Sequence, residues 1–155
     1  MTKIGGIVEN KNLTLYRISS VEDEPGAAGR ILKFFAEYQI NFEYITESST
    51  ADGTAVMAIG VRAEKAEEFD KNLQKLAGHG LDLNIKKIED VSILGIYGPH
   101  FREKPALAAK FCMTLGKAGV NILGISSSIS SICGVIGNRE IEKAKTALFS
   151  EFELP

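Results

Sequence analysis

Residues 23–28 read DEPGAA and residues 40–45 read INFEYI, and both stretches return later in the chain, as EKPALA at 103–108 and VNILGI at 120–125. The two copies are offset by 80 residues, from position 23 to 103 and from 45 to 125. An internal repeat indicates the fold more strongly than any single motif does. The sequence therefore predicts two copies of one structural unit.

Length and composition agree with two small globular units that share burial, because lone units of about 70–80 residues are marginally stable. Hydrophobic residues make up 45% of the 155 residues, and the formal net charge is −2. This charge provides no basic field for nucleic acid or an anionic membrane. No apolar run approaches the roughly 20 residues of a membrane span. The amino terminus lacks the pattern of a secretory signal. We therefore expect a cytoplasmic protein with no nucleic-acid or membrane partner.

The first copy reads as alternating strands and helices. Strands are predicted at 13–18, 40–47, 54–61 and 83–88, and residues 51–53 read as a hairpin turn. Pro25 suits the first turn of a helix, and the residues after it with helical spacing form an apolar stripe: Ala28, Ile31, Leu32, Phe35 and Tyr38. A second helix buries Ala66, Phe69, Leu73 and Leu76. The resulting β-α-β-β-α-β order is the ferredoxin-like fold, of the α+β class.

The second copy has one strand fewer. Its strands are predicted at 91–96, 120–127 and 131–136. One of its helices is expected to bury Ala108, Phe111, Cys112 and Leu115, and the other Ile141, Ala144, Leu148 and Phe152. A strand at 3–8 is left over before the first copy, followed by a polar turn at 9–12. Because an unpaired sheet edge promotes aggregation, we predict that this strand crosses over and completes the second unit.

The units predicted from this strand count are residues 11–89 and residues 90–155 with strand 3–8. The alternative is a local hairpin between 3–8 and 13–18. A hairpin there would leave the second half folded after residues 1–9 are deleted.

Several function classes lack the residues they need. The predicted central strands at 54–61 and 131–136 carry no aromatic residue for stacking nucleic-acid bases. Cys112 and Cys133 have no CxxC spacing and are expected to be reduced structural thiols. No catalytic triad, metal-ligand spacing or phosphate-binding glycine loop is visible. We therefore expect no catalytic residue, metal or cofactor.

The first predicted helix start has the chemistry of an amino-acid receptor. Free N–H groups of Gly26, Ala27 and Ala28 are expected to bind a carboxylate at the positive end of the helix dipole. Asp23 would accept hydrogen bonds from a protonated amine. Glu43 and Glu47, on the adjoining strand, would face one side together. The alternatives are structural: Asp23 equally suits a residue that only stabilises the helix start, and Glu43 suits an exposed strand acid.

The Asp-x-Pro-Gly-x-Ala stretch at 23–28, Ile-Asn-Phe-Glu at 40–43, and Val-Asn-Ile with the serines that follow at 120–128 resemble ACT domains. Two such units with the preceding strand Gly6-Ile7-Val8 are similar to the regulatory region of aspartate kinases, over about residues 3–153. The resemblance implies that the leading strand completes the second unit. It also implies a homodimer in which an amino-acid effector lies between the first unit of one chain and the second unit of the other.

Carried over by position, the resemblance implies nine effector-binding residues. They are Asp23, Gly26, Ala27, Ala28, Phe42 and Glu47 from the first unit, and Ala108, Asn121 and Ile122 from the partner. Two positions depart from the family pattern. Ala106 replaces the usual glycine, so we expect the second helix start to be empty. Glu47 replaces a common amide, which favours lysine over threonine.

The function predicted is a non-catalytic regulatory protein that binds a small amino acid of the lysine or threonine type. The alternative is a separate regulatory subunit of a two-chain aspartate kinase, whose catalytic chain would then be a partner. A third interpretation is a dimerisation module with an inactive site.

Overall fold

The computed structural model describes residues 1–80, 83–99, 101–103 and 106–155, and these divide into two compact units. The first unit spans Leu13–Glu89. The second combines Met1–Asn12 with Asp90–Pro155. Our ranges of 11–89 and 90–155 with 3–8 stay a prediction for the two functional units.

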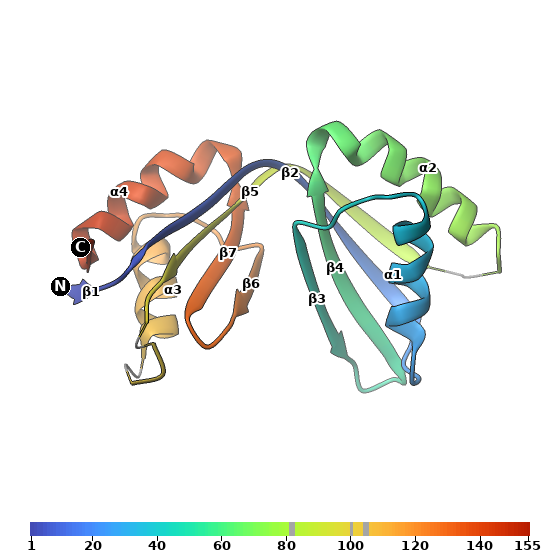
Figure 1. Cartoon of the computed structure of the whole chain (residues 1–155), viewed down its shortest axis with the longest axis horizontal. Helices are drawn as coiled ribbons and strands as arrows, with labels where there is room; N and C mark the ends of the chain where they lie inside the picture. Colours follow the sequence, from blue (N-terminus) through green and yellow to red (C-terminus); the bar gives the residue numbers. More distant parts are fainter. Residues whose placement is uncertain (81–82, 100, 104–105) are drawn as a thin grey trace. The chain divides into compact units, whose positions relative to one another are not determined.

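The first unit has the predicted β-α-β-β-α-β order (Figure 1). Its elements are β2 (Gly6–Glu22), α1 (Ala27–Glu37), β3 (Tyr44–Ser49), β4 (Thr54–Arg62), α2 (Ala66–Ala77) and β5 (Asn84–Tyr97), with a short 3-10 helix at Ala63–Lys65. The strand order is β3-β4-β2-β5. Central strand β4 pairs antiparallel with both β2 and β3. This arrangement is the ferredoxin-like fold.

Aromatic side chains join the two helices of the first unit to its sheet. The rings of Phe35 on α1 and Phe69 on α2 are fully buried and stack with centroids 4.4 Å apart. Tyr16 of β2 packs on Phe69 and donates a hydrogen bond of 2.6 Å to Asp70 Oδ1. Burial, and then this hydrogen bond, raises the pKa of Tyr16. Met57 and Ile59 of β4 complete this core, so the face of the sheet that α1 and α2 cover is apolar, as the pattern predicts.

The second unit repeats this arrangement with β5, α3 (Leu107–Lys117), β6 (Gly124–Ser127), β7 (Ser131–Gly137) and α4 (Ile141–Glu151). Short 3-10 helices lie at Phe101–Glu103 and Asn138–Glu140. The strand order is β2-β5-β7-β6, and β7 pairs antiparallel with β5 and β6. Phe111 and Leu115 of α3 and Ala144 and Leu148 of α4 are buried in its core.

The amino-terminal segment completes the second unit, as predicted. Ile4 is buried in that unit's core, and the N–H of Gly5 donates to the Tyr97 carbonyl at 2.7 Å. A two-residue strand, β1 (Thr2–Lys3), pairs in parallel with β8 (Phe152–Glu153). The remainder of the segment is the first part of β2, which is the neighbour of β5 in the sheet.

Two predicted breaks in the chain are wrong. The turn at 9–12 is part of the continuous strand β2, so the hairpin between 3–8 and 13–18 does not form. The strands predicted at 83–88 and 91–96 are likewise one strand, β5. Asn12 and Asp90 have positive φ angles of 60° and 56°. Because Asn and Asp tolerate the left-handed region, a polar residue can bend a strand there without ending it.

The loops around the repeated motif also differ from the predictions. Helix α1 begins at Ala27, after Pro25, and strands β3 and β6 begin at Tyr44 and Gly124, four residues later than predicted. The strand predicted to end at residue 18 runs further, because β2 continues to Glu22 through a register shift near Ser20. The hairpin turn at 51–53 is confirmed.

In the first turn of α3, Leu107 is buried and Ala108 is exposed, so the prediction that Ala108 is buried is wrong. Leu107, Phe111 and Leu115 form an i, i+4, i+8 stripe, and Ala108 lies about 100° away from it around the helix. Cys112 packs beside the core and is half-buried, and both Cys112 and Cys133 are free thiols.

Deleting residues 1–9 should unfold the second unit while leaving the first folded. The deletion removes Ile4 from the core and exposes the backbone edge of β5 that β2 covers. Amide hydrogen exchange measured residue by residue would test this. Protection should disappear over 90–155 and persist over 13–80, which serves as the internal control. Retained protection over 90–155 would contradict the prediction.

Candidate functional site

The backbone at the start of α1 is open to a ligand. Gly26 is the N-cap residue, has a φ of 84°, and α1 has no side-chain cap. The N–H of Ala27 donates to the Glu24 carbonyl at 3.1 Å, so the prediction that this group is free is wrong. The N–H groups of Gly26 and Ala28 have no acceptor within the described part of the chain. The helix start therefore offers two of the three predicted donors.

Asp23 provides a free carboxylate beside these donors. Its N–H donates to the Gly53 carbonyl at 3.1 Å, which ties the loop to the β3–β4 turn. Its side chain is exposed and has no hydrogen-bond or ion-pair partner among residues 1–80, 83–99, 101–103 and 106–155. The site can therefore present an acceptor for an amine close to donors for a carboxylate.

Two other acids near this loop, Glu24 and Asp52, are already engaged. Glu24 pairs with Arg30, one turn into α1. Asp52 accepts hydrogen bonds from Thr50 and Thr54, and these bonds lower the pKa of Asp52 to about 2. Of these three acids, Asp23 is the one left free for a ligand.

Phe42 and Glu47 lie toward the edge strand β3. Phe42 is half-buried in the loop before β3 and makes edge-to-face contacts with Phe35 and Phe69, at 6.0 and 6.4 Å between centroids. Glu47 is exposed and lies opposite Met57 of β4, on the face that the helices cover. Glu43 precedes β3 and pairs with Arg62 at 3.2 Å, so its expected role as a second free strand acid is wrong.

The residues predicted on the partner's side belong to the second unit. Ala108 is exposed in the first turn of α3. Asn121 is exposed in the loop between α3 and β6, where a strand was predicted to start. Ile122 packs against the core of the second unit beside Gly134. The nine candidate residues thus fall into six from the first unit and three from the second.

Local pattern missed the ion pairs around the first helix start. Arg30 follows Gly26 by four residues, so a helical wheel drawn from residue 26 would have placed the two on the same side. Arg62 has no comparable local signal, since its pairing with Glu43 comes from the sheet. Within the described residues, no group of three or more His, Cys, Asp or Glu side chains could hold a metal ion. The described helices include none that is long and apolar enough to span a membrane.

Two ferredoxin-like units in tandem define the class of protein by fold, and the helices α1 and α3 both start without a side-chain cap. The ACT-domain family model matches residues 16–78, and a second ACT-domain model matches residues 94–152. The chain therefore belongs to the ACT-domain family, with two domains in tandem.

The relatives of this chain are aspartate kinases. It is 25% identical over 151 residues to the aspartokinase of Corynebacterium glutamicum, covering 96% of this chain and 36% of that protein. The chain therefore spans about a third of the length of this curated relative.

Solved regulatory subunits match over their whole length. The ligand-free regulatory subunit of aspartate kinase from Thermus thermophilus superposes with a TM-score of 0.86 at 22% identity, over 97% of this chain and 99% of that one. A structure of aspartokinase alpha and beta subunits gives a TM-score of 0.82 at 26% identity, with 95% and 97% covered. The chain thus matches the regulatory, non-catalytic part of aspartate kinases, and the family models find only ACT domains in it.

Gly26 and Ala106 give a direct test of the two helix starts. Ala106 is the N-cap of α3 and has a φ of 66°, a left-handed conformation that costs a residue with a Cβ atom about 1–2 kcal/mol. Allowing for the greater chain entropy that glycine loses, Gly26→Ala should destabilise the protein by about 1 kcal/mol. Ala106→Gly should stabilise it by about 0.5–1 kcal/mol for the same reason.

Urea denaturation followed by circular dichroism would measure both changes. Gly29→Ala is the matched control, because Gly29 lies within α1, its φ is not positive, and nothing lies within 4 Å of an added Cβ atom. This variant should gain about 0.5–1 kcal/mol of helix stability. Equal changes in stability for Gly26→Ala and Gly29→Ala would contradict the left-handed conformation assigned to Gly26.

Proposed function

We propose that this chain is a non-catalytic, cytoplasmic regulatory protein that binds a small amino-acid effector at a homodimer interface. Six residues of one chain form one side of the site: Asp23, Gly26, Ala27, Ala28, Phe42 and Glu47. The partner's Ala108, Asn121 and Ile122 form the other side. The effector binds two arrangements of the dimer with different affinities, and its binding therefore shifts the equilibrium between them.

The observation that carries this proposal is the pairing of free opposite groups at the start of α1. The unbonded N–H groups of Gly26 and Ala28 suit an α-carboxylate at the positive end of the helix dipole. The free Asp23 carboxylate suits an α-ammonium. The absence of a side chain at Gly26 lets the backbone of the ligand approach closely.

Exposed edge strands support a homodimer. β3 and β6 are the outer strands in the strand order. Each carries an isoleucine at an equivalent position of the repeat, Ile45 and Ile125, and each side chain is 44% exposed. An open strand edge that carries apolar residues can pair with a strand of another chain. Pairing β3 with the partner's β6 would cover both edges and place the two halves of the site together.

Glu47 favours a basic effector side chain. Its carboxylate is exposed on β3 and has no ion-pair partner among the described residues. An additional unpaired acid near the site is better matched by the ammonium of lysine than by the hydroxyl of threonine.

Asp23→Ala should abolish amino-acid binding, because it removes the only proposed partner of the α-ammonium. Isothermal titration calorimetry with a panel that includes lysine and threonine would measure this. Glu103→Ala is the matched control, since Glu103 occupies the equivalent repeat position in the second unit and should not affect binding. Absence of heat for the whole panel with the unaltered chain would refute the proposal.

The alternative function is a separate regulatory subunit of a two-chain aspartate kinase. It is favoured by the extent of the match, because this chain and the Thermus thermophilus regulatory subunit cover each other almost completely. Amino-acid binding alone does not distinguish the alternatives, since such a subunit would also bind an effector.

Affinity purification of the tagged chain from its native cytoplasm, followed by an aspartate kinase assay, would separate these functions. A two-chain enzyme predicts that ATP-dependent phosphorylation of aspartate co-purifies with the chain and responds to the effector. A homodimer without kinase activity favours the stand-alone regulator. A chain that dimerises but binds no amino acid is a dimerisation module.

A further inference from the structure

The first unit contains a cavity of about 740 Å³ between α1, the end of β2 and the C-terminal end of α2. We call it the α1–α2 cavity. Val21, Ile31 and Leu76 line it and are at most 5% exposed, so its floor is the hydrophobic core itself. Of the nine candidate effector residues, Ala27 alone lines it among the described positions. A cavity of this size with an apolar floor suits a small organic ligand.

Three aromatic rings form one wall of the cavity. Phe34 makes tilted contact with Tyr38, with centroids 5.3 Å apart, and edge contact with His79 at 6.1 Å. Tyr38 is 38% exposed although it is a large apolar side chain. A flat ring of a ligand can make edge-to-face or offset contacts with aromatic side chains of this kind.

The free charge around the cavity is negative. Glu22 and Glu37 line it, and neither has an ion-pair partner within the described part of the chain. The nearby cations are engaged, because Arg30 pairs with Glu24 and the ammonium of Lys75 lies 4.9 Å from the centroid of the Tyr38 ring. Among the described residues that line the cavity, Glu22 and Glu37 are therefore available as acceptors for a cationic group, whereas Arg30 is already paired.

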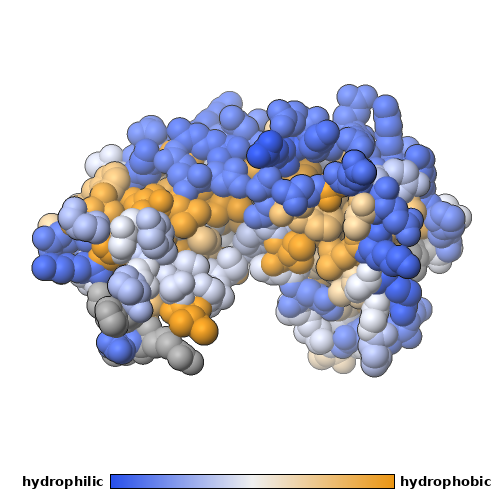
Figure 2. Space-filling view, viewed as in Figure 1, coloured by the Kyte–Doolittle hydropathy of each residue, from blue (hydrophilic) through white to orange (hydrophobic). Residues whose placement is uncertain are grey.

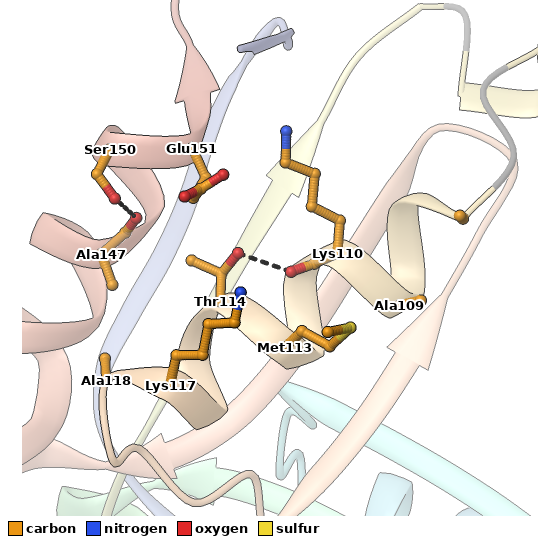
Figure 3. A pocket seen from close by; sticks show the side chains of 10 residues that line it. Ala109, Lys110, Met113, Thr114, Lys117, Ala118, Ala147, Ser150 and Glu151 are labelled. Atoms are coloured by element: carbon orange, nitrogen blue, oxygen red, sulfur yellow. Dashed lines mark hydrogen bonds between the residues drawn. The ribbon is translucent and has the colours of Figure 1, made fainter.

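The second unit provides a comparison from the same chain. Its α3–α4 groove, of about 440 Å³, lies at the equivalent place in the repeat (Figure 3). Thr114, Lys117 and Ala118 line this groove at the positions of Phe34, Glu37 and Tyr38, each 80 residues further along. Figure 3 shows Lys110 and Lys117 projecting from the same helix, α3. The helix face that carries Phe34, Glu37 and Tyr38 in the first copy thus carries a cation and no aromatic ring in the second, where Glu151 of α4 also lines the groove.

This difference is not required by the fold. The second unit folds with threonine and alanine in place of Phe34 and Tyr38, so the helix pair does not need aromatic residues there. Ser20, on the rim of the α1–α2 cavity, has a positive φ of 61° next to the register shift in β2. Such strained residues and strand irregularities are concentrated at functional sites.

We propose that the α1–α2 cavity is a second ligand site, which binds a small molecule with an aromatic ring and a protonated amine. The ring lies against Phe34 and Tyr38, and the ammonium is placed near the carboxylates of Glu22 and Glu37. This site is separate from the proposed effector site, and its ligand needs no α-carboxylate.

The test uses the full chain and three matched probes: 2-phenylethylamine, 2-phenylethanol and phenylacetate. Titration followed by NMR chemical shifts should show saturable binding of the amine, with shifts at residues 34 and 38. Because the amine can form a charge-assisted hydrogen bond, it should bind at least about tenfold more tightly than the alcohol. Phenylacetate should bind more weakly than either. Equal binding of the amine and the carboxylate would overturn the proposal, as would no saturable shift with the amine.

Variants locate the site and separate it from the effector site. Glu37→Gln and Tyr38→Leu change exposed side chains, and each should weaken amine binding about tenfold while the thermal melting curve stays unchanged. Lys117→Gln, the matched control in the second unit, should leave amine binding unaltered. Asp23→Ala should abolish amino-acid binding only. If amine binding survives both Glu37→Gln and Tyr38→Leu, or is lost in Lys117→Gln or Asp23→Ala, the cavity is not the site.

Discussion

The second unit depends on a strand that comes from the opposite end of the chain. A sheet edge inside a compact unit must have its backbone N–H and C=O groups paired, because unpaired groups buried from water are costly. The second copy of the repeat supplies only β5, β6 and β7, and residues 1–12 supply the missing neighbour of β5. Ile4 and the pairing of β1 with β8 anchor this segment at its start. Each unit therefore reaches the same ferredoxin-like arrangement by a different order of the chain.

The duplicated units keep their helix cores and differ on their surfaces. Phe35 and Leu115, which lie 80 residues apart at equivalent positions of the repeat, are both fully buried. Residues that do not support the core have diverged, as in Gly26 and Ala106 at the helix starts. The surface of the second unit also shows apolar groups at its β6–β7 turn (Figure 2), where Ile129 is 66% exposed. Two copies of one fold can diverge in this way and carry different binding sites.

The spacing of apolar residues along the helices was the most reliable sequence signal for burial. The inward residues of α2 were predicted correctly, as were those of α4 up to Leu148, because a stripe with a period of 3.6 residues reports burial directly. Phe152 is buried but belongs to β8, and Tyr38, predicted in the stripe of the first helix, is exposed. Strand ends were less reliable. Polar residues such as Asn12 and Asp90 have turn-forming preferences, and the sheet pairing on either side of them overrides these preferences. The open start of α1 was predicted, but the use of the Ala27 N–H in a local turn was not.

The sequence by itself determined that the chain holds two ferredoxin-like ACT units and that a leading strand completes the second. These conclusions follow from repetition, periodicity and strand number, which are properties of the chain order. Only the tertiary structure decided which charges remain free. Glu43 is neutralised by Arg62 and Asp52 is held by two threonines, whereas Asp23 is left unpaired. The physical reason is that pairing depends on distance in space, which sheet register sets and local sequence does not.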